Sequence, residues 1–251
     1  MILVFGGTTE GKKVAALLES LALPFVYSTK TKTSFQETKV ARYSHGALDE
    51  AQLESFLTNN KVKIIVNAAH PFAEVLHNTI AKVATRLQMP VIRFGRKLLA
   101  KTIHPLVFYV NTYEEALALL KENQRLLALT GVQSIEKLKS WWQNNTTHFR
   151  ILDRPASLAI AVKNNFPKKQ LILGLPSANL QTEIDLIKTH EIDVILTKET
   201  GNSGFLSTKI EAALKTNTQI IIINQPKVPA YFEVVDSVDA LELAISKTIV
   251  I

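Results

Sequence analysis

Short apolar runs alternate with longer amphipathic segments along the whole chain. The short runs are rich in Val, Ile, Leu and Phe, which is typical of strands buried on both faces. The segments between them carry apolar residues at helical spacing. This alternation predicts an α/β protein in which parallel strands are joined by helices.

The predicted elements fall into two series. The first has strands at residues 2–5, 25–28, 40–43, 63–67 and 91–93 and helices at 10–21, 49–59 and 72–88. The second has strands at 106–110, 125–129, 149–152, 170–173, 193–197 and 219–223 and helices at 113–122, 134–143, 155–165, 179–189, 206–214 and 238–246. The periodicity breaks between residues 97 and 113. We therefore expect two Rossmann-like lobes, residues 1–110 and 111–251, each a mainly parallel sheet flanked by helices, with the active site in the cleft between them.

The turn after the first strand has the spacing of a dinucleotide-binding motif. Gly6, Thr8 and Gly11 stand where that motif has its three small residues, with Thr8 in place of the second glycine. Such a turn brings the backbone close to a pyrophosphate and directs helix N–H groups at it. The hydroxyl of Thr8 is expected to donate one further hydrogen bond. A plain strand-to-helix turn is the alternative interpretation.

The loop after the second strand is basic. It reads Ser28-Thr29-Lys30-Thr31-Lys32-Thr33, with hydroxyls and ammonium groups where an NAD-binding protein has a carboxylate for the ribose. This composition favours the 2′-phosphate of NADPH over NADH. A solvated basic loop remains the alternative.

Two further loops follow predicted strands and carry reactive side chains. In Ala69-His70-Pro71-Phe72, Pro71 suits the first position of a helix and His70 stands at its mouth, able to bind a ligand, donate a proton or cap the turn. The loop at residues 197–205 combines glycines, hydroxyls and Lys198, which suits an anion-binding rim, unless Lys198 simply pairs with Glu199 or solvent.

Composition narrows the function classes. The chain has a formal net charge of +7 and no cysteine, which favours an anionic partner and excludes disulfides and thiolate metal ligands. The basic residues are scattered without an aromatic platform, so no nucleic acid is expected as partner. His70 and His77 lie seven residues apart, two turns along one predicted helix, and would need further carboxylate or histidine partners to bind a metal ion, so no metal site is expected. No run suits a membrane span and no signal-peptide pattern opens the chain, so we expect a cytoplasmic protein without a membrane partner.

Three segments of the chain carry a resemblance to a known family. They are the glycine turn, the segment Ala-Ala-His-Pro-Phe-Ala, and the segment Thr-Lys-Glu-Thr-Gly followed by Lys-Ile-Glu-Ala-Ala. In this order and spacing they resemble the precorrin-6A reductase family of cobalamin biosynthesis. The resemblance covers the whole chain. It implies hydride transfer from a reduced nicotinamide cofactor to one double bond of precorrin-6A or cobalt-precorrin-6A. Asn67 and Ala69 depart from the family pattern, which has aspartate and threonine there.

The resemblance places Gly6, Gly7, Thr8 and Glu10 in the cofactor turn and the following residues along the cleft: His70, Pro71, Phe72, Thr130, Gly131, Thr197, Lys198 and Gly201. With the loops above, the predicted cofactor residues are Gly6, Gly7, Thr8, Thr9, Glu10, Gly11, Ser28, Thr29, Lys30, Ala69, His70, Thr130 and Gly131. The predicted substrate residues are His70, Pro71, Phe72, Arg93, Arg96, Arg154, Thr197, Lys198, Thr200 and Gly201, with Lys30, Lys32 and Lys97 as further cations for the carboxylates of the macrocycle. His70 and Lys198 are the candidate catalytic residues.

Other functions remain open at this stage. The chain is also compatible with an NADPH-dependent reductase of another polyanionic substrate, a non-catalytic NADPH-binding regulator, or, more remotely, an S-adenosylmethionine-dependent methyltransferase. The sequence leaves open whether NADH can serve, whether the ring carries cobalt, which face receives hydride and which group supplies the proton. We expect a monomer or a weak homo-oligomer.

Overall fold

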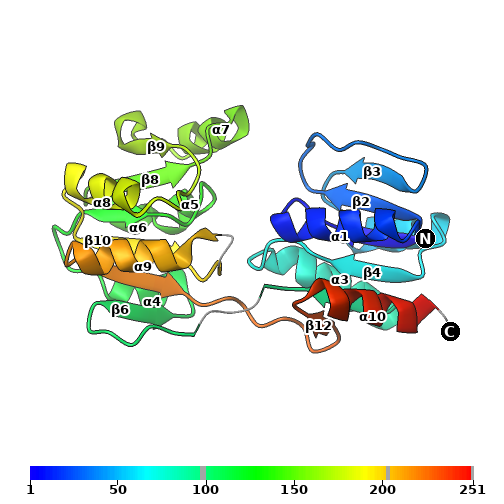
Figure 1. Cartoon of the computed structure of the whole chain (residues 1–251). Helices are drawn as coiled ribbons and strands as arrows, with labels where there is room; N and C mark the ends of the chain where they lie inside the picture. Colours follow the sequence, from blue (N-terminus) through cyan, green and yellow to red (C-terminus); the bar gives the residue numbers. More distant parts are fainter. Residues whose placement is uncertain (97–99, 202–203, 250–251) are drawn as a thin grey trace. The chain divides into compact units, whose positions relative to one another are not determined.

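The computed structural model describes residues 1–96, 100–201 and 204–249, and the chain divides into two compact units. The first unit comprises Met1–Lys97 and Pro226–Ile251, and the second comprises Leu98–Gln225. Each unit contains one sheet with helices on both faces (Figure 1).

The sheet of the first unit is parallel throughout. Its order is β12-β5-β4-β1-β2-β3. The strands are β1 (Ile2–Phe5), β2 (Phe25–Thr29), β3 (Ala41–His45), β4 (Ile64–Asn67), β5 (Val91–Phe94) and β12 (Glu233–Val235). The central strands are buried at every position because helices cover both faces.

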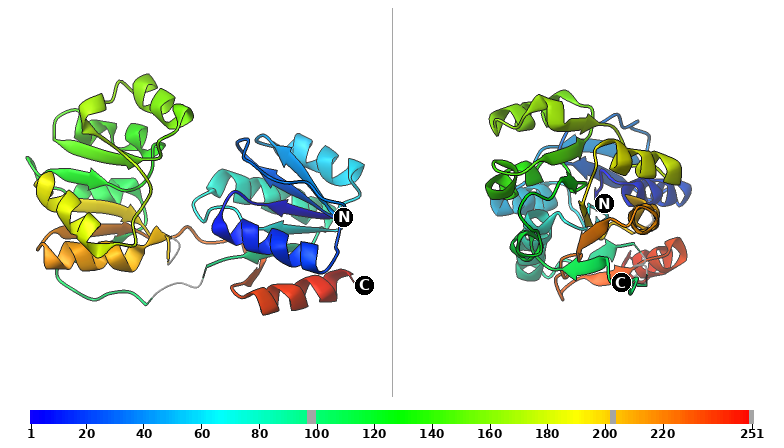
Figure 2. Two further views of the ribbon diagram at one scale, coloured as in Figure 1. Left: turned by 45° about the horizontal axis from the view of Figure 1, so that its top comes forward. Right: turned by 90° about the vertical axis from the view of Figure 1, so that its left-hand side faces the viewer.

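Four helices cover this first sheet. They are α1 (Thr9–Ser20), α2 (Glu50–Asn59), α3 (Glu74–Leu87) and α10 (Val238–Ile249). Leu18 of α1 and Leu241 of α10 pack with Ile2 and Val4 on one face, whereas Leu53 of α2 and Ile80 of α3 pack on the other. Figure 2 shows these layers from two further directions.

The sheet of the second unit is also parallel, with the order β6-β11-β10-β7-β8-β9. Its strands are β6 (Val107–Val110), β7 (Leu126–Ala128), β8 (Thr147–Ile151), β9 (Leu171–Leu173), β10 (Val194–Lys198) and β11 (Gln219–Ile223). Its helices are α4 (Tyr113–Ala118), α5 (Ser134–Lys137), α6 (Lys139–Trp142), α7 (Pro155–Lys163), the 3₁₀ turn η1 (Lys168–Gln170), α8 (Leu180–Thr189) and α9 (Leu206–Lys215).

The helices of the second unit also form two layers. Ile187 of α8 and Ile210 of α9 pack on one face of the sheet with Ile195 and Ile220. On the other face, the rings of Trp142 and Phe149 pack edge-on against Phe166. The connections from β7 through β8 to β9 run in one direction along the sheet, and the connection from β10 to β11 runs in the other. Because such connections are right-handed, their helices lie on opposite faces of the sheet.

The sequence predicted the α/β class and nearly all elements, with local differences in several of them. Helix α3 begins at Glu74 rather than residue 72, because a turn closed by hydrogen bonds to His70 precedes it. The prediction that Pro71 opens this helix is therefore wrong. The helix expected at 134–143 is broken at Leu138 into α5 and α6, and the strand expected at 40–43 is β3 (Ala41–His45). Strand β12 was missed.

The division of the chain also differs from the expected lobes 1–110 and 111–251. Strand β6 pairs with β11 and so belongs to the second unit, although it precedes residue 111. Strand β12 pairs with β5, and α10 contributes Leu241 to the first core. Residues 226–251 therefore return to the first unit. Long-range pairing decided this division, and β12 has too few apolar residues to indicate it locally.

The connections reverse direction once in each sheet. In the first unit the reversal lies between β1 and β4, and in the second it lies between β7 and β10. Open parallel sheets bind ligands at this position, beyond the carboxyl ends of the strands. The loops around Gly6, His70, Gly131 and Lys198 follow these four strands. Among the described residues, no helix is long and apolar enough to cross a membrane.

Candidate cofactor and substrate sites

Thr8 caps helix α1 and connects two loops of the first unit. Its Oγ1 accepts a hydrogen bond from Gly11 N at 2.9 Å and donates one to Ala68 O at 2.7 Å. The hydroxyl proton is thus committed to the loop after β4. This differs from the expectation that it donates to a ligand phosphate. The glycine turn and residues 68–72 are nevertheless adjacent, as their place at the reversal between β1 and β4 requires.

The small residues of the glycine turn are required by Tyr27 on β2. A Cβ on Gly6 would lie 2.1 Å from the Tyr27 ring, and a Cβ on Gly11 would lie 2.8 Å from its hydroxyl. Gly7 adopts a φ of +88° and donates its N–H to the Tyr27 hydroxyl at 2.9 Å. Tyr27 therefore fixes the path of the turn, a role that the sequence analysis missed.

The turn retains donors for an anion. Within the part of the chain that the structure describes, no group accepts a hydrogen bond from the N–H of Thr8 or Thr9. These donors lie at the N-terminus of a twelve-residue helix, where the backbone favours negative charge. The turn therefore fits the pyrophosphate of a dinucleotide, and side chains from β2 and β4 border it.

Glu10 and Arg96 form an ion pair in the first unit. The distance from Arg96 Nη2 to Glu10 Oε2 is 2.9 Å, and both side chains are largely buried. Both residues were predicted to contact ligands, Glu10 the cofactor and Arg96 the substrate. In the structure the carboxylate of one neutralises the guanidinium of the other.

Arg93 has a structural environment rather than the exposed one expected of a substrate cation. It is 3% exposed, and its Nη1 donates to Asn67 O at 2.9 Å, Ala69 O at 2.8 Å and Asn67 Oδ1 at 3.3 Å. Burial, followed by the charge of Arg96, lowers the pKa of Arg93 to about 10. The guanidinium remains charged and fixes the backbone after β4.

Asn67 and His77 extend this network. Asn67 Nδ2 lies 2.9 Å from His77 Nδ1, and His77 Nε2 lies 3.2 Å from His70 O. Burial, followed by the charge of Arg93, lowers the pKa of His77 to about 4. The ring is neutral at physiological pH, with Nδ1 as acceptor and the proton on Nε2. Asn67 thus uses its amide as both donor and acceptor, which the aspartate of the family pattern cannot do.

His70 is exposed at the end of this network. Its Nδ1 accepts a hydrogen bond from Phe72 N at 3.2 Å, and its ring lies 5.9 Å from that of Phe72. Pro71 is buried and Phe72 is half-buried. The sequence is compatible with ligand binding, catalysis or turn capping by His70, and the contact with Phe72 N supplies the capping.

The basic loop after β2 is held by aromatic side chains. Ser28 and Thr29 are buried, and Thr29 Oγ1 bonds to Thr31 O at 2.8 Å and to the Tyr43 hydroxyl at 2.7 Å. The Phe35 ring stacks between the rings of Tyr27 and Tyr43, at 4.6 and 5.5 Å. Lys30 and Lys32 are exposed on this ordered loop, as a contact with a phosphate requires, whereas Thr29 is engaged within it.

In the second unit the predicted Thr-Gly turn follows β7. Thr130 is buried, its Oγ1 lies 2.5 Å from Ser134 Oγ, and Ser134 Oγ donates to Gly131 O at 2.6 Å. Gly131 adopts a φ of +85°, and a Cβ there would meet nothing within 4 Å. The space next to Gly131 is therefore open, while the hydroxyls of Thr130 and Ser134 are hydrogen-bonded to each other.

The loop after β10 lies beside this turn because β10 pairs with β7. Thr197 and Gly201 are buried, whereas Lys198 and Thr200 are half-buried. Glu199 Oε2 accepts a hydrogen bond from Gln225 N at 2.9 Å, so its carboxylate is engaged with the end of β11. Arg154 is exposed as the residue before α7, whereas Lys97 and residues 202–203 lie outside the described residues.

The second unit also buries charged residues that the sequence analysis did not select. Arg150 Nη1 lies 2.7 Å from Glu183 Oε1, and Lys209 Nζ lies 3.5 Å from Thr197 Oγ1. Lys209 stands on the apolar face of α9, between Leu206 and Ile210. A lysine on the apolar face of a predicted helix is the sequence feature that could have indicated this buried charge.

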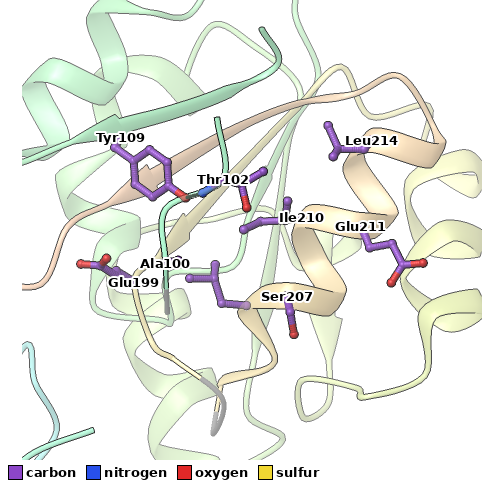
Figure 3. A pocket seen from close by; sticks show the side chains of 9 residues that line it. Ala100, Thr102, Tyr109, Glu199, Ser207, Ile210, Glu211 and Leu214 are labelled. Carbon is purple, nitrogen blue, oxygen red and sulfur yellow. Dashed lines mark hydrogen bonds between the residues drawn. The ribbon is translucent and has the colours of Figure 1, made fainter. Parts of the chain in front are cut away.

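A cavity of about 440 Å³ lies between α9 and the segment leading into β6. Its lining includes Ser207, Ile210 and Glu211 of α9, and Figure 3 shows the Ile210 side chain pointing toward Thr102 and Tyr109. Thr102 N donates to the Tyr109 hydroxyl at 2.9 Å. The residues that line the cavity include Glu199 but none of the predicted substrate residues. In the described part of the chain, no three His, Asp or Glu side chains are grouped to hold a metal ion.

Comparison with known proteins identifies the family. The model of the precorrin-6x reductase CbiJ/CobK family matches residues 1–245. The chain is 27% identical to a cobalt-precorrin-6A reductase of Methanocaldococcus jannaschii, over 94% of this chain and 95% of that one. It is 25% identical to a precorrin-6A reductase of a Sinorhizobium species, over 95% of this chain and 89% of that one.

A solved structure described as CobK precorrin-6A reductase has the same fold, with a TM-score of 0.80 and 21% identity over 98% of this chain and 96% of that one. The family match, the similarity to these relatives and the shared fold agree with the resemblance stated from the motifs. The chain belongs to the precorrin-6x reductase CbiJ/CobK family, the precorrin-6A reductases of cobalamin biosynthesis.

Proposed function

We propose that this reductase uses NADPH, bound at the glycine turn of residues 6–11, to reduce a precorrin-6A-type macrocycle. A reductase of this family needs a reduced nucleotide donor. The observation that carries the assignment of its site is the pair of N–H groups on Thr8 and Thr9, which have no acceptor in the described structure, at the start of α1. When bound, the nicotinamide supplies the hydride, and the protein supplies position and electrostatics.

The preference for NADPH rests on the loop after β2. Lys30 and Lys32 are exposed there, and Tyr43 holds the loop through hydrogen bonds to Thr29 and to Thr33 N. Ammonium groups on an ordered loop bind a phosphate monoester more strongly than a free hydroxyl. A carboxylate that would favour NADH is absent from the sequence of residues 28–33.

The macrocycle carries several carboxylates, which suits exposed or half-exposed cations. Lys198 at the end of β10 and Arg154 before α7 meet this requirement. Arg93 and Arg96 do not, since Arg93 is buried among carbonyl oxygens and Arg96 pairs with Glu10. We therefore assign substrate binding to Lys198 and Arg154 and a positioning role to Arg93.

His70 is our candidate for the proton donor. Its Nδ1 accepts from Phe72 N, so in the neutral ring the proton is on Nε2. The Arg93 and His77 contacts to residues 67–70 hold the backbone that presents the ring. In this assignment His70 protonates the carbon next to the one that receives hydride.

The test is NADPH oxidation, followed at the nicotinamide absorbance, with metal-free precorrin-6A and cobalt-precorrin-6A as substrates. We expect oxidation that requires the macrocycle and yields the dihydro product. His70→Asn should lower kcat by about a hundredfold with a nearly unchanged KM for NADPH. NADPH binding without substrate-dependent oxidation would instead support a non-catalytic regulator. Oxidation only with another polyanion would mean that the substrate is not a precorrin-6A-type macrocycle.

A further inference from the structure

The second unit holds a buried charged cluster that is incomplete. It consists of Arg150 on β8, Glu183 on α8, Thr197 on β10 and Lys209 on α9. The four residues are between 0% and 9% exposed. Two cations face a single carboxylate, so the cluster carries one excess positive charge while Lys209 is protonated.

The strand register places this cluster at the carboxyl edge of the sheet. Leu196 pairs with Ala128, and Ala128 pairs with Phe149, so Thr197 and Arg150 stand at the same level, one residue nearer the edge. Both side chains point to the face covered by α8 and α9. This edge is where ligands bind to open parallel sheets, and half-buried Lys198 directly follows Thr197.

Several donors of the cluster lack acceptors among the described residues. Arg150 Nη1 donates to Glu183 Oε1, but Arg150 Nη2 is buried without a hydrogen-bond partner. Lys209 Nζ has three hydrogens, and its one hydrogen bond to a described residue is to Thr197 Oγ1, at the long distance of 3.5 Å. Glu183 also accepts from Ser177 N at 3.3 Å, which leaves it less able to satisfy Lys209.

Such an arrangement is costly without a further anion. Buried donors without acceptors lose their hydration without replacement, and the penalty is larger for charged groups. Burial, followed by the charge of Arg150, lowers the pKa of Lys209 to about 8. An oxyanion between them would satisfy the free N–H groups and neutralise the excess charge.

We propose that Lys209, Arg150 and Thr197 form a buried oxyanion subsite that binds one carboxylate of the macrocycle or one phosphate of the nucleotide. Lys209 and Arg150 supply the charge and the N–H donors, and the Thr197 hydroxyl orients Lys209. Glu183 Oε1 holds Arg150 through Nη1, at 2.7 Å. This proposal deepens the proposed function and rests on it, since both oxyanions belong to reactants of that reaction.

The test compares Lys209→Met with Lys215→Met, a matched control on the same helix whose lysine is exposed and pairs with Glu211. Turnover is measured with NADPH and the macrocycle varied separately. Lys209→Met should raise the KM for one reactant at least about tenfold. A rise for the macrocycle identifies a carboxylate and a rise for NADPH identifies a phosphate, while Lys215→Met should match the wild type.

Lys209→Gln separates binding from a structural role. Glutamine can still hydrogen-bond Thr197 but lacks the charge, so it should show the same rise in KM if an oxyanion is bound. If Gln restores wild-type KM values, or if Lys209→Met lowers only the melting temperature, the subsite does not exist. Binding of uroporphyrin, a tetrapyrrole with eight carboxylates, provides a second measurement on the wild type and both variants. The variants should bind it more weakly where the oxyanion is a carboxylate and as tightly as the wild type where it is a phosphate.

Failure of the underlying function gives a different result. If wild-type protein does not oxidise NADPH with the macrocycle, the proposed function fails before any variant is compared. If the wild type is active and Lys209→Met and Lys209→Gln keep both KM values, only the oxyanion subsite is overturned.

Discussion

The Thr8 hydroxyl donates to the carbonyl oxygen of Ala68 at 2.7 Å, and so fastens the turn after β1 to the loop after β4. The same oxygen caps α1 by accepting from Gly11 N. One side chain therefore shapes both loops at the point where the first sheet reverses direction. Because Ala68 lies two residues before His70, this hydrogen bond also connects the glycine turn to the backbone that leads to His70.

Removing the Thr8 hydroxyl should weaken the first unit. Thr8→Val loses the cap and the contact with Ala68, so we expect the free energy of unfolding to fall by about 1–2 kcal/mol. Thr8→Ser keeps both bonds and should stay close to the wild type in urea unfolding. Thr8→Asp keeps the cap but adds negative charge, so it should raise the KM for NADPH by at least about tenfold. An unchanged KM for Thr8→Asp would mean that no phosphate lies at this turn.

Arg93 should contribute to stability rather than to substrate charge recognition. Arg93→Met leaves the carbonyl oxygens of Asn67 and Ala69 without their buried donor, and we expect a loss of about 3 kcal/mol. Arg42→Met, which removes an exposed arginine on β3, is the matched control and should change stability by less than about 0.5 kcal/mol. Wild-type stability together with a raised KM for the macrocycle would contradict this assignment.

The low pKa of His77 predicts acid sensitivity. The folded protein holds the ring neutral, with a pKa of about 4, beside Arg93 and Asn67, whereas the unfolded chain has the ordinary value of 6.5. Unfolding therefore takes up a proton between these values, so stability is full above pH 6.5 and falls as the pH drops towards 4. The loss should reach about 3 kcal/mol.

Urea unfolding at a series of pH values measures this effect. His77→Gln keeps a side chain that hydrogen-bonds and removes the titration, so its stability should depend less on pH over the same interval. Parallel curves for the wild type and this variant would show that His77 does not control the acid response.

Reversing the charges of Lys30 and Lys32 should change the cofactor preference. The double variant Lys30→Glu, Lys32→Glu should raise the KM for NADPH by about tenfold or more and change the KM for NADH by less than about threefold. The control is Lys61→Glu, Lys63→Glu, an exposed pair at the amino end of β4. Equal losses for both cofactors would remove the argument for a 2′-phosphate contact in this loop.

Truncating Lys198 should affect the macrocycle more than folding. Because Lys198 is half-buried at the end of β10, Lys198→Ala should raise the KM for the macrocycle by about tenfold with little change in melting temperature. Lys188→Ala, an exposed lysine on α8, is the comparison and should keep wild-type kinetics. A large drop in melting temperature with normal kinetics would instead assign Lys198 to packing.

The sequence by itself determined the α/β class, most of the elements and the candidate loops. Parallel strands that are buried on both faces appear in the sequence as continuous apolar runs, and the turns after them are rich in small residues. Both features are local and can be recognised without knowledge of the tertiary structure. The motifs around Gly6, His70 and Lys198 also indicated the family, because their order and spacing are read from the sequence and do not depend on tertiary contacts.

Only the tertiary structure decided which charged residues are available and where the chain is divided. Arg93 and Lys198 are both cations near strand ends in the sequence, yet one is enclosed by carbonyl oxygens and the other is half-exposed. Burial depends on neighbours far apart in the chain, as the return of β12 to β5 also shows. The pairing of Arg150 with Glu183 and the position of Lys209 follow from the same cause: side chains from four elements meet only after the sheet has formed.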